Sequence, residues 1–159
     1  MKKINRWRND PSLVDYLGSP YRFINLEVDY KWYDSYMLNR NTNVRCAIVD
    51  EKDEILGLVS LLNINHLNQS AEFHIMIGET ENRGKGIGTF ATKSIINHAF
   101  NNLNLHRVEL TVLEDNVRAR NLYEKIGFVL EGVKRHVIYK NGSFVNMCIY
   151  SILKNEFSE

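Results

Sequence analysis

The chain has 159 residues, of which 44% are apolar and 25% charged, and its 20 basic and 19 acidic residues leave a formal net charge of +1. This length fits one domain with an ordinary core, which we expect to span residues 1–159. The balance of charge excludes a global field that would gather nucleic acid or an anionic membrane. Cys46 and Cys148 are too few for a disulfide framework, and no signal segment opens the chain, so we expect a cytoplasmic protein.

Two helices are predicted in the first 40 residues. Asp10 is a plausible N-cap with Pro11 at the first helical position, and a second helix covers residues 26–38. The second helix carries an apolar stripe at helical spacing. The stripe consists of Val28, Trp32, Tyr33, Tyr36 and Met37. Such a stripe usually packs into the core, although with Tyr21 it could also form the wall of an acceptor site.

Strand patterns dominate the middle of the chain. Residues 44–50 and 54–65 flank an acidic turn and predict an antiparallel hairpin, and residues 70–79 predict a third strand. The apolar run at 55–64 is about half as long as a membrane-spanning helix, so we expect a buried strand there.

The pattern changes to helical spacing at residue 87. The face of this helix consists of Ile87, Phe90, Ala91, Ile95, Ala99 and Leu103. A strand at 107–113, a helix at 116–127 ended by Gly127, and two strands around the turn 140–143 follow. The resulting order, ααβββαβαββ, predicts an α/β domain with a mixed sheet.

The loop between the third strand and the long helix, "ETENRGKGIGTFATK", predicts an anion site. Gly84, Gly86 and Gly88 lie where a helix begins, and the free backbone N–H groups of a helix start bind phosphate. A P-loop is excluded because Gly86 follows Lys85 where a Ser or Thr would hold magnesium.

Two other phosphate-binding designs remain. A dinucleotide fingerprint is formally present as Gly86, Gly88 and Ala91, with Glu109 at a suitable distance for a ribose contact. The meander of strands before it and the long gap after Ile77 argue against this design. The last design is R-x-x-G-x-G, which starts at Arg83.

This R-x-x-G-x-G loop resembles the pyrophosphate loop of the GCN5-related N-acetyltransferases (GNAT). The segment "NVRARNLYEKIGF" is similar to the second motif of that family, with Asn116, Ala119, Tyr123, Gly127 and Phe128 at its spacing. The resemblance covers nearly the whole chain and points to the branch of ribosomal-protein N-terminal, spermidine and nucleotide-amino-sugar acetyltransferases. It implies a mixed, mostly antiparallel central sheet flanked by helices, with acetyl-CoA as cosubstrate and no metal.

The chain departs from the family pattern at two places. The usual first strand is apparently missing before the first helix, and Asn146 replaces the Asp that many relatives have in the "NG..VD" signature. Any substrate contact of that carboxylate is therefore in doubt here.

The resemblance also implies a set of site residues. Tyr123 would be the general acid that protonates the leaving thiolate, although at helical spacing it could be a core aromatic. Asn116 could be only an N-cap, and Arg83 and Lys85 could belong to a solvated loop. The implied coenzyme contacts are Ile75, Met76, Ile77, Arg83, Gly84, Lys85, Gly86, Ile87, Gly88, Thr89, Asn116 and Arg120.

The reaction also needs a base, because a free alkylammonium has a pKa near ~10 and must lose a proton before it attacks. Glu72 is the candidate, and strand alternation places Glu72, His74 and Met76 on one face. Glu72 could instead be structural, in which case His74 or a water would collect the proton.

These observations predict an N-acetyltransferase that moves an acetyl group from acetyl-CoA to a primary amine of a small molecule, a polyamine or an amino sugar, by direct attack through a tetrahedral intermediate. The alternatives are an N-terminal acetyltransferase of a ribosomal or other protein and a non-catalytic acetyl-CoA-binding module. Residues 16–23 carry no carboxylate, which argues against a polycation. A bare sheet edge predicts a homodimer or a higher homo-oligomer, with no nucleic-acid or membrane partner.

Overall fold

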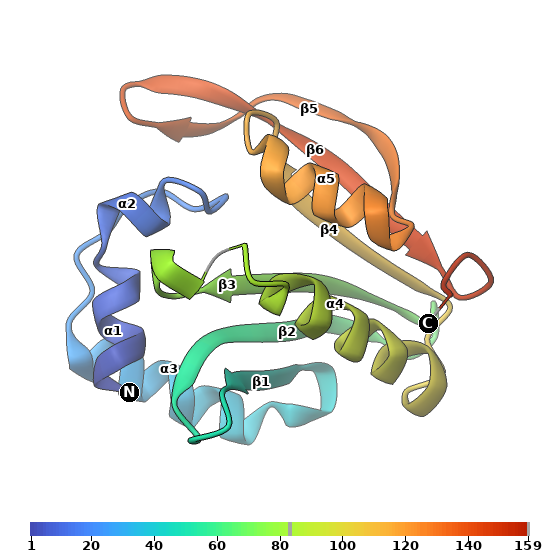
Figure 1. Ribbon diagram of the computed structural model, residues 1–159, viewed down its shortest axis with the longest axis horizontal. Helices are drawn as coiled ribbons and strands as arrows, with labels where there is room; N and C mark the ends of the chain where they lie inside the picture. Colours follow the sequence, from blue (N-terminus) through green and yellow to red (C-terminus); the bar gives the residue numbers. More distant parts are fainter. Residues whose placement is uncertain (83, 159) are drawn as a thin grey trace.

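A six-stranded mixed sheet lies between two groups of helices in the computed structural model, which describes residues 1–82 and 84–158 (Figure 1). The strands are β1 (Val44–Val49), β2 (Ile55–Asn65), β3 (Ser70–Ile77), β4 (Arg107–Leu113), β5 (Val129–Lys140) and β6 (Ser143–Leu153). Their spatial order is β1-β2-β3-β4-β6-β5. Adjacent strands are antiparallel except β3 and β4, which confirms the predicted mixed sheet and both predicted hairpins.

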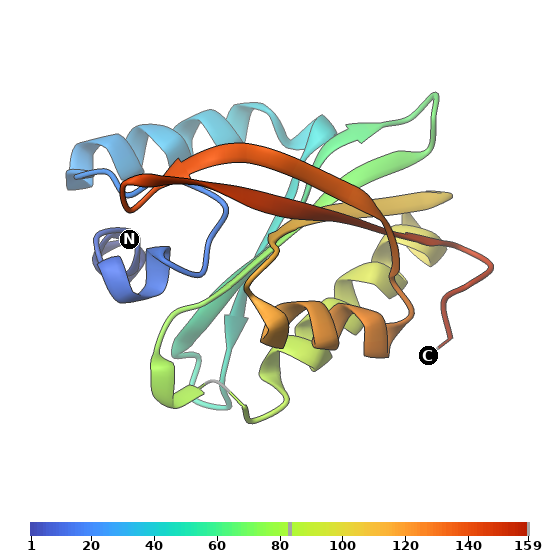
Figure 2. The ribbon, with the colours of Figure 1, turned by 90° about the horizontal axis from the view of Figure 1, so that it is seen from above.

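The helices cover both faces of this sheet. They are α1 (Lys2–Arg8), α2 (Pro11–Val14), α3 (Leu26–Leu38), α4 (Ile87–Asn97) and α5 (Val117–Ile126), with the short 3-10 helices η1 (Arg40–Thr42) and η2 (Thr80–Asn82) and the π-helix η3 (His98–Asn102), which continues α4. Figure 2 shows α3 on one side of the sheet and α4 with α5 on the other. None of the helices within residues 1–82 and 84–158 is long and apolar enough to cross a membrane.

Helix α1 is an addition to the predicted order. The expected helix at Pro11 is present, because the Asp10 side chain accepts a hydrogen bond from the Ser12 N–H at 2.9 Å. Helix α1 precedes it without a side-chain cap and with two buried residues, Ile4 and Trp7, so the sequence offered neither a cap signal nor a full apolar stripe. No strand precedes α1 in the described chain.

The expectation that the stripe on α3 packs into the core is wrong. Val28, Tyr33 and Met37 are each about half exposed, and the residue that α3 buries is Asp29. Its carboxylate forms an ion pair with Arg8 and accepts a 2.6 Å hydrogen bond from Asn5 Nδ2. Helix α3 is therefore joined to α1 by an ion pair whose carboxylate is buried, and Tyr30 and Tyr33 of α3 are left about half exposed.

The main core lies between the sheet and the pair α4 and α5. Ala91, Ile95 and Ala99 are buried as predicted, whereas Phe90 is 73% exposed and Ile96 is buried instead. The buried face of α4 is thus rotated from the predicted one, so that it includes Ile96 and excludes Phe90, because the helix packs on both β2 and α5. A smaller cluster of Ile4, Trp7 and Leu13 packs on the opposite face of the sheet, against Leu58 and Met76.

Candidate active site

The sheet opens between its two parallel strands. Backbone pairing of β3 with β4 covers three residue pairs and ends at Glu72 and Glu109, although both strands continue. Residues Ile75 to Ile77 remain paired with β2 on their other side. Their backbone groups that point away from β2 therefore have no strand partner among the described residues. This split offers hydrogen-bonding groups to an extended ligand at the centre of the sheet.

The glycine loop leads from the end of β3 to the start of α4. Gly84 and Gly86 have φ values of 84° and 81°, a region that other residues enter only at a cost, and Gly86 is the N-cap of α4. The N–H groups of Ile87, Gly88 and Thr89 begin the helix and have no intrahelical acceptor. Nothing lies within 4 Å of the position of a Gly86 Cβ, so a phosphate has room to approach.

The predicted loop residues differ in what they do. Lys85 is exposed beside the two glycines, and Arg83 lies outside the described residues. Gly88 has a packing role, because a Cβ there would lie 3.2 Å from Leu122 of α5. Ile87 packs against the main core. The candidate anion site would therefore use backbone groups from Gly84 to Thr89, and Lys85 is one of the cations that the structure describes beside it.

The arginine that the structure brings to this loop is Arg118, which the sequence analysis missed. One of its terminal nitrogens lies 3.4 Å from the position of a Gly84 Cβ. The predicted Arg120 is directed elsewhere: its Nε donates to the Tyr150 hydroxyl at 3.2 Å, and its Nη1 donates to the Glu114 carbonyl at 3.0 Å. Residues two apart on a helix point in different directions, which is the signal that could have separated the two arginines.

Asn116 is the N-cap of α5, the alternative that the motif left open. Its Oδ1 accepts from the Ala119 N–H at 3.2 Å, and its Nδ2 donates to the Tyr16 carbonyl at 3.2 Å. Both polar atoms of this side chain are thus engaged within the protein. Its observed role is to join the start of α5 to the loop after α2.

Tyr123 lies under the split on the face covered by α4 and α5. Its ring packs edge-on against Phe73 of β3 with 6.0 Å between centroids, and against Phe128 at 5.8 Å. The residue is 8% exposed, and burial raises the pKa of its phenol to about 12. No described residue forms a hydrogen bond with its hydroxyl, so the phenol proton is not shared with an acceptor within the described residues.

Glu72 lies on the opposite face of β3, as strand alternation predicts. Its side chain is 46% exposed, and one oxygen lies 3.6 Å from Nε2 of His74. Its register partner Glu109 is held by Arg107 at 2.9 Å, so the two carboxylates are not equivalent. Glu109 is paired with an arginine, whereas the described ion-pair partner of Glu72 is the neighbouring His74. Glu72 lies at the last paired position of β3, where the split begins.

Helix α1 touches the segment that leads into the glycine loop. The Trp7 ring lies directly on Gly78, where a Cβ would be only 2.0 Å from a ring carbon. The Trp7 Nε1 also donates a 3.0 Å hydrogen bond to Glu79, and Arg6 forms an ion pair with the same carboxylate. The hydrogen bond from Trp7 and the charge of Arg6 lower the pKa of Glu79.

The turn between β5 and β6 fastens the loop that follows α2. Lys140 is 8% exposed, and its Nζ donates to the carbonyls of Val14 and Leu17 at 2.6 and 2.7 Å. The neighbouring Asn141 donates to Asp15 Oδ1 at 3.1 Å. Figure 1 shows this hairpin end beside α2. The hairpin thus fixes one wall of the region in front of the split.

A comparison with known families now identifies this arrangement. The model of the acetyltransferase (GNAT) domain matches residues 2–129. The chain belongs to the GNAT acetyltransferase family. The GNAT domain and the spermidine acetyltransferases described next show that the chain is an acetyl-CoA-dependent acyltransferase that acts on amines.

Several relatives of this GNAT chain are spermidine N(1)-acetyltransferases. The Escherichia coli K12 protein is 34% identical over 155 residues, which cover 94% of this chain and 80% of that protein. The Vibrio cholerae protein is 31% identical over 159 residues, with 99% and 89% covered. The crystal structure of a Vibrio cholerae spermidine N-acetyltransferase with CoA and spermine superposes with a TM-score of 0.90 and 28% identity, covering 98% and 90% of the two chains.

Asn146 stands where the sequence resemblance suggested an aspartate. Its Nδ2 donates to Glu114 Oε2 at 2.8 Å, and its Oδ1 accepts from the His136 N–H at 2.8 Å. An aspartate at this position would place a second carboxylate against Glu114. The amide therefore suits its two partners, and its observed contacts are structural.

Proposed function

We propose that this GNAT enzyme transfers the acetyl group of acetyl-CoA to a primary amine of a polyamine. The observation that supports this most is the split between β3 and β4, which ends at a helix N-terminus and has Tyr123 on one face and Glu72 on the other. The backbone groups of the glycine loop fit a pyrophosphate, and the free groups of Ile75 to Ile77 fit the extended arm of the coenzyme.

The two proton transfers would take place on opposite faces of β3. The amine would approach from the side of α1 to α3, where Glu72 takes its proton directly or through a water. The nitrogen then attacks the thioester carbonyl, whose bond to sulfur breaks as the tetrahedral intermediate collapses. Tyr123 would give its proton to the leaving sulfur, a role that suits a phenol that remains protonated at neutral pH.

The polyamine class rests on the spermidine N-acetyltransferases among the relatives. Residues 15–25 contribute one carboxylate to the acceptor wall, Asp15, and Asn141 donates a hydrogen bond to it.

A second candidate acceptor is a protein N-terminus. A Bacillus subtilis protein named as a putative ribosomal N-acetyltransferase is 38% identical over 103 residues, covering 65% of this chain and 56% of that protein.

The test is thiol release from acetyl-CoA with spermidine, spermine, nucleotide amino sugars and ribosomal-protein N-terminal peptides at equal concentration. We expect the polyamines to give the highest kcat/KM. Faster turnover of a peptide would refute the polyamine assignment and support the second candidate. If the protein binds coenzyme but releases no thiol with any amine, the result would refute the enzyme assignment and support a non-catalytic acetyl-CoA-binding module.

We also propose that the protein forms a homodimer in the cytoplasm. Strand β5 is an edge of the described sheet, and its surface carries exposed apolar side chains such as Val133, Val137 and Tyr139. A second copy would cover them. Light scattering at tens of micromolar should show twice the mass of the chain, and a monomer at that concentration would refute this assembly.

A further inference from the structure

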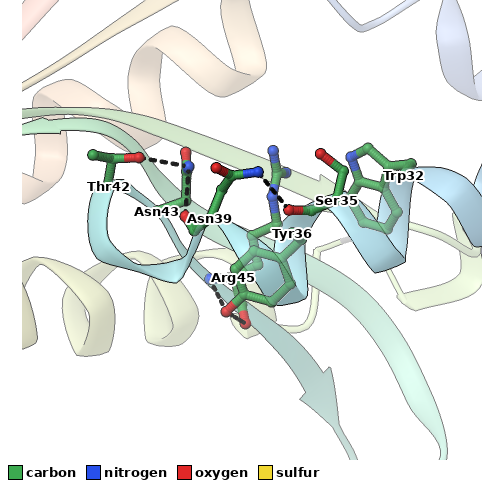
Figure 3. Close-up of a pocket in the computed structure, with 7 residues that line it drawn as sticks. All are labelled: Trp32, Ser35, Tyr36, Asn39, Thr42, Asn43 and Arg45. Carbon is green, nitrogen blue, oxygen red and sulfur yellow. Dashed lines mark hydrogen bonds between the residues drawn. The ribbon is translucent and has the colours of Figure 1, made fainter.

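A polar pocket lies away from the split, at the edge of the sheet formed by β1. It is bounded by the C-terminal half of α3, by η1 and by the start of β1, and its volume is about 250 Å³ (Figure 3). None of its lining residues belongs to the glycine loop or to the proposed pair of Glu72 and Tyr123. The catalytic proposal therefore leaves this pocket unexplained.

A guanidinium without a carboxylate partner lies in this pocket. Arg45 lies over the ring of Trp32 at 5.0 Å and near that of Tyr36 at 5.8 Å. Its Nε is shielded from solvent and has no hydrogen-bond partner among the described residues. A buried donor without an acceptor costs free energy, and no described residue competes with an anion for this guanidinium.

The surrounding charge also favours an anion. Arg8 also lies over the Trp32 ring system at 5.7 Å, but its charge is balanced by Asp29. Burial, with the charge of Arg8, lowers the pKa of Arg45. The cluster of Arg8, Asp29 and Arg45 thus carries one uncompensated positive charge, and none of the described residues that line the pocket is acidic.

The other lining groups are neutral hydrogen-bonding side chains. Asn39 Nδ2 uses one hydrogen to donate to the Ser35 carbonyl at 2.8 Å, which leaves its second N–H free. The hydroxyls of Ser35 and Thr42 add further donors, and Asn43 is fixed by its bond to Thr42 at 3.1 Å. Figure 3 shows the Arg45 side chain extending between Asn39 and Trp32.

We propose that this pocket, defined by Arg45, Asn39, Ser35 and Thr42, is a binding site for a small oxyanion. The ligand is a phosphate or carboxylate group that takes hydrogen bonds from the Arg45 guanidinium and from the neighbouring amide and hydroxyls. A planar guanidinium on an aromatic ring suits this task, because the ring orients the donors without competing for the anion.

The experiment uses the full chain saturated with coenzyme A, so that the glycine loop is already occupied. Inorganic phosphate and, separately, acetate are titrated at constant ionic strength, with chloride as the balance. The readouts are the melting temperature and the ¹H–¹⁵N resonance of the Arg45 Nε–H. We expect phosphate, acetate or both to shift this resonance and to raise the melting temperature beyond the chloride series, and the anion that acts identifies the group.

Two variants separate the pocket from general charge effects. Arg45→Gln should weaken phosphate or acetate binding by about tenfold or more, since it removes charge-assisted hydrogen bonds. Arg40→Gln removes an equal charge from exposed η1 and should bind as the wild type does. Equal responses of wild type and Arg45→Gln would overturn the proposal. So would an Arg45 Nε–H resonance in the wild type that neither anion moves, a result that does not depend on the folding of any variant.

Discussion

Raising the pH above 10 should destabilise the fold through Tyr123. The pKa of its buried phenol is about 12, against an ordinary value of 10.0. Between these values the unfolded chain releases the proton while the folded chain keeps it, so the free energy of unfolding falls as pH rises. The contribution of the protonated Tyr123 phenol to the free energy of unfolding is therefore complete below pH 10, where both states are protonated. It is lost as the pH approaches 12.

The size of this effect follows from the two pKa values. At pH 11 the unfolded phenol is about tenfold more deprotonated than the folded one, which corresponds to about 1.4 kcal/mol. For a chain of this length, that free energy lowers the melting temperature by roughly 3–6 °C. The Tyr123→Phe variant has no proton to lose and should lack this part of the decrease.

Urea unfolding at pH 9 and pH 11 measures the effect, as the wild-type loss minus the loss in Tyr123→Phe. The subtraction removes the titration of the other tyrosines and of the lysines, which both proteins share. Tyr30→Phe is the matched control, because Tyr30 is 50% exposed and its removal should leave the wild-type pH dependence in place. Equal losses in wild type and Tyr123→Phe would refute the argument that burial holds the proton on Tyr123.

Three further predictions concern binding and catalysis. Gly86→Asp should weaken coenzyme binding by at least about tenfold, because it adds bulk and negative charge at the N-terminus of α4; unchanged affinity by calorimetry would move the phosphate site elsewhere. Glu72→Gln should slow turnover near neutral pH by roughly 10²- to 10⁴-fold and recover as pH approaches the amine pKa of ~10; pH–rate curves parallel to those of the wild type would exclude Glu72 as the base. Lys140→Met should lower the free energy of unfolding by about 1–3 kcal/mol and raise the KM for the amine, while coenzyme affinity is kept. The exposed control Lys134→Met, on the same hairpin, should change neither the free energy of unfolding nor the KM. An unaltered KM in Lys140→Met would mean that the hairpin does not support the acceptor wall.

The strands and the two long helices of the catalytic half could be predicted from the sequence because local signals mark them. Asp10 with Pro11, Asn116 and Gly127 are capping residues whose geometry depends on a few neighbouring positions. The six strands show period-two or continuous apolar patterns between turn residues. Tyr123 could also be selected as a candidate site residue from the sequence, because its motif lies within one short segment of α5.

The N-terminal helices show where local patterns fail. The sequence placed the aromatic face of α3 in the core, whereas a buried Asp29 with Arg8 fixes the helix in the opposite sense. A charge pair between residues 21 positions apart leaves no periodic trace. The same holds for Lys140, whose partners lie more than 100 residues away, and for Arg118, which reaches the loop only after α4 and α5 have packed.

The contact of Trp7 with Gly78 and Glu79 would couple the binding of the two substrates. Helix α1 lies on the side from which the amine would approach, whereas Gly78 and Glu79 lead directly into the loop that would receive the coenzyme. A shift of Glu79 on coenzyme binding would be transmitted to α1 through the indole. Thermodynamic reciprocity then requires the amine to change coenzyme affinity by the factor with which coenzyme changes amine affinity. The steady-state kinetics of this enzyme should therefore depart from independent binding, and the departure should vanish when the side chain of Trp7 is removed.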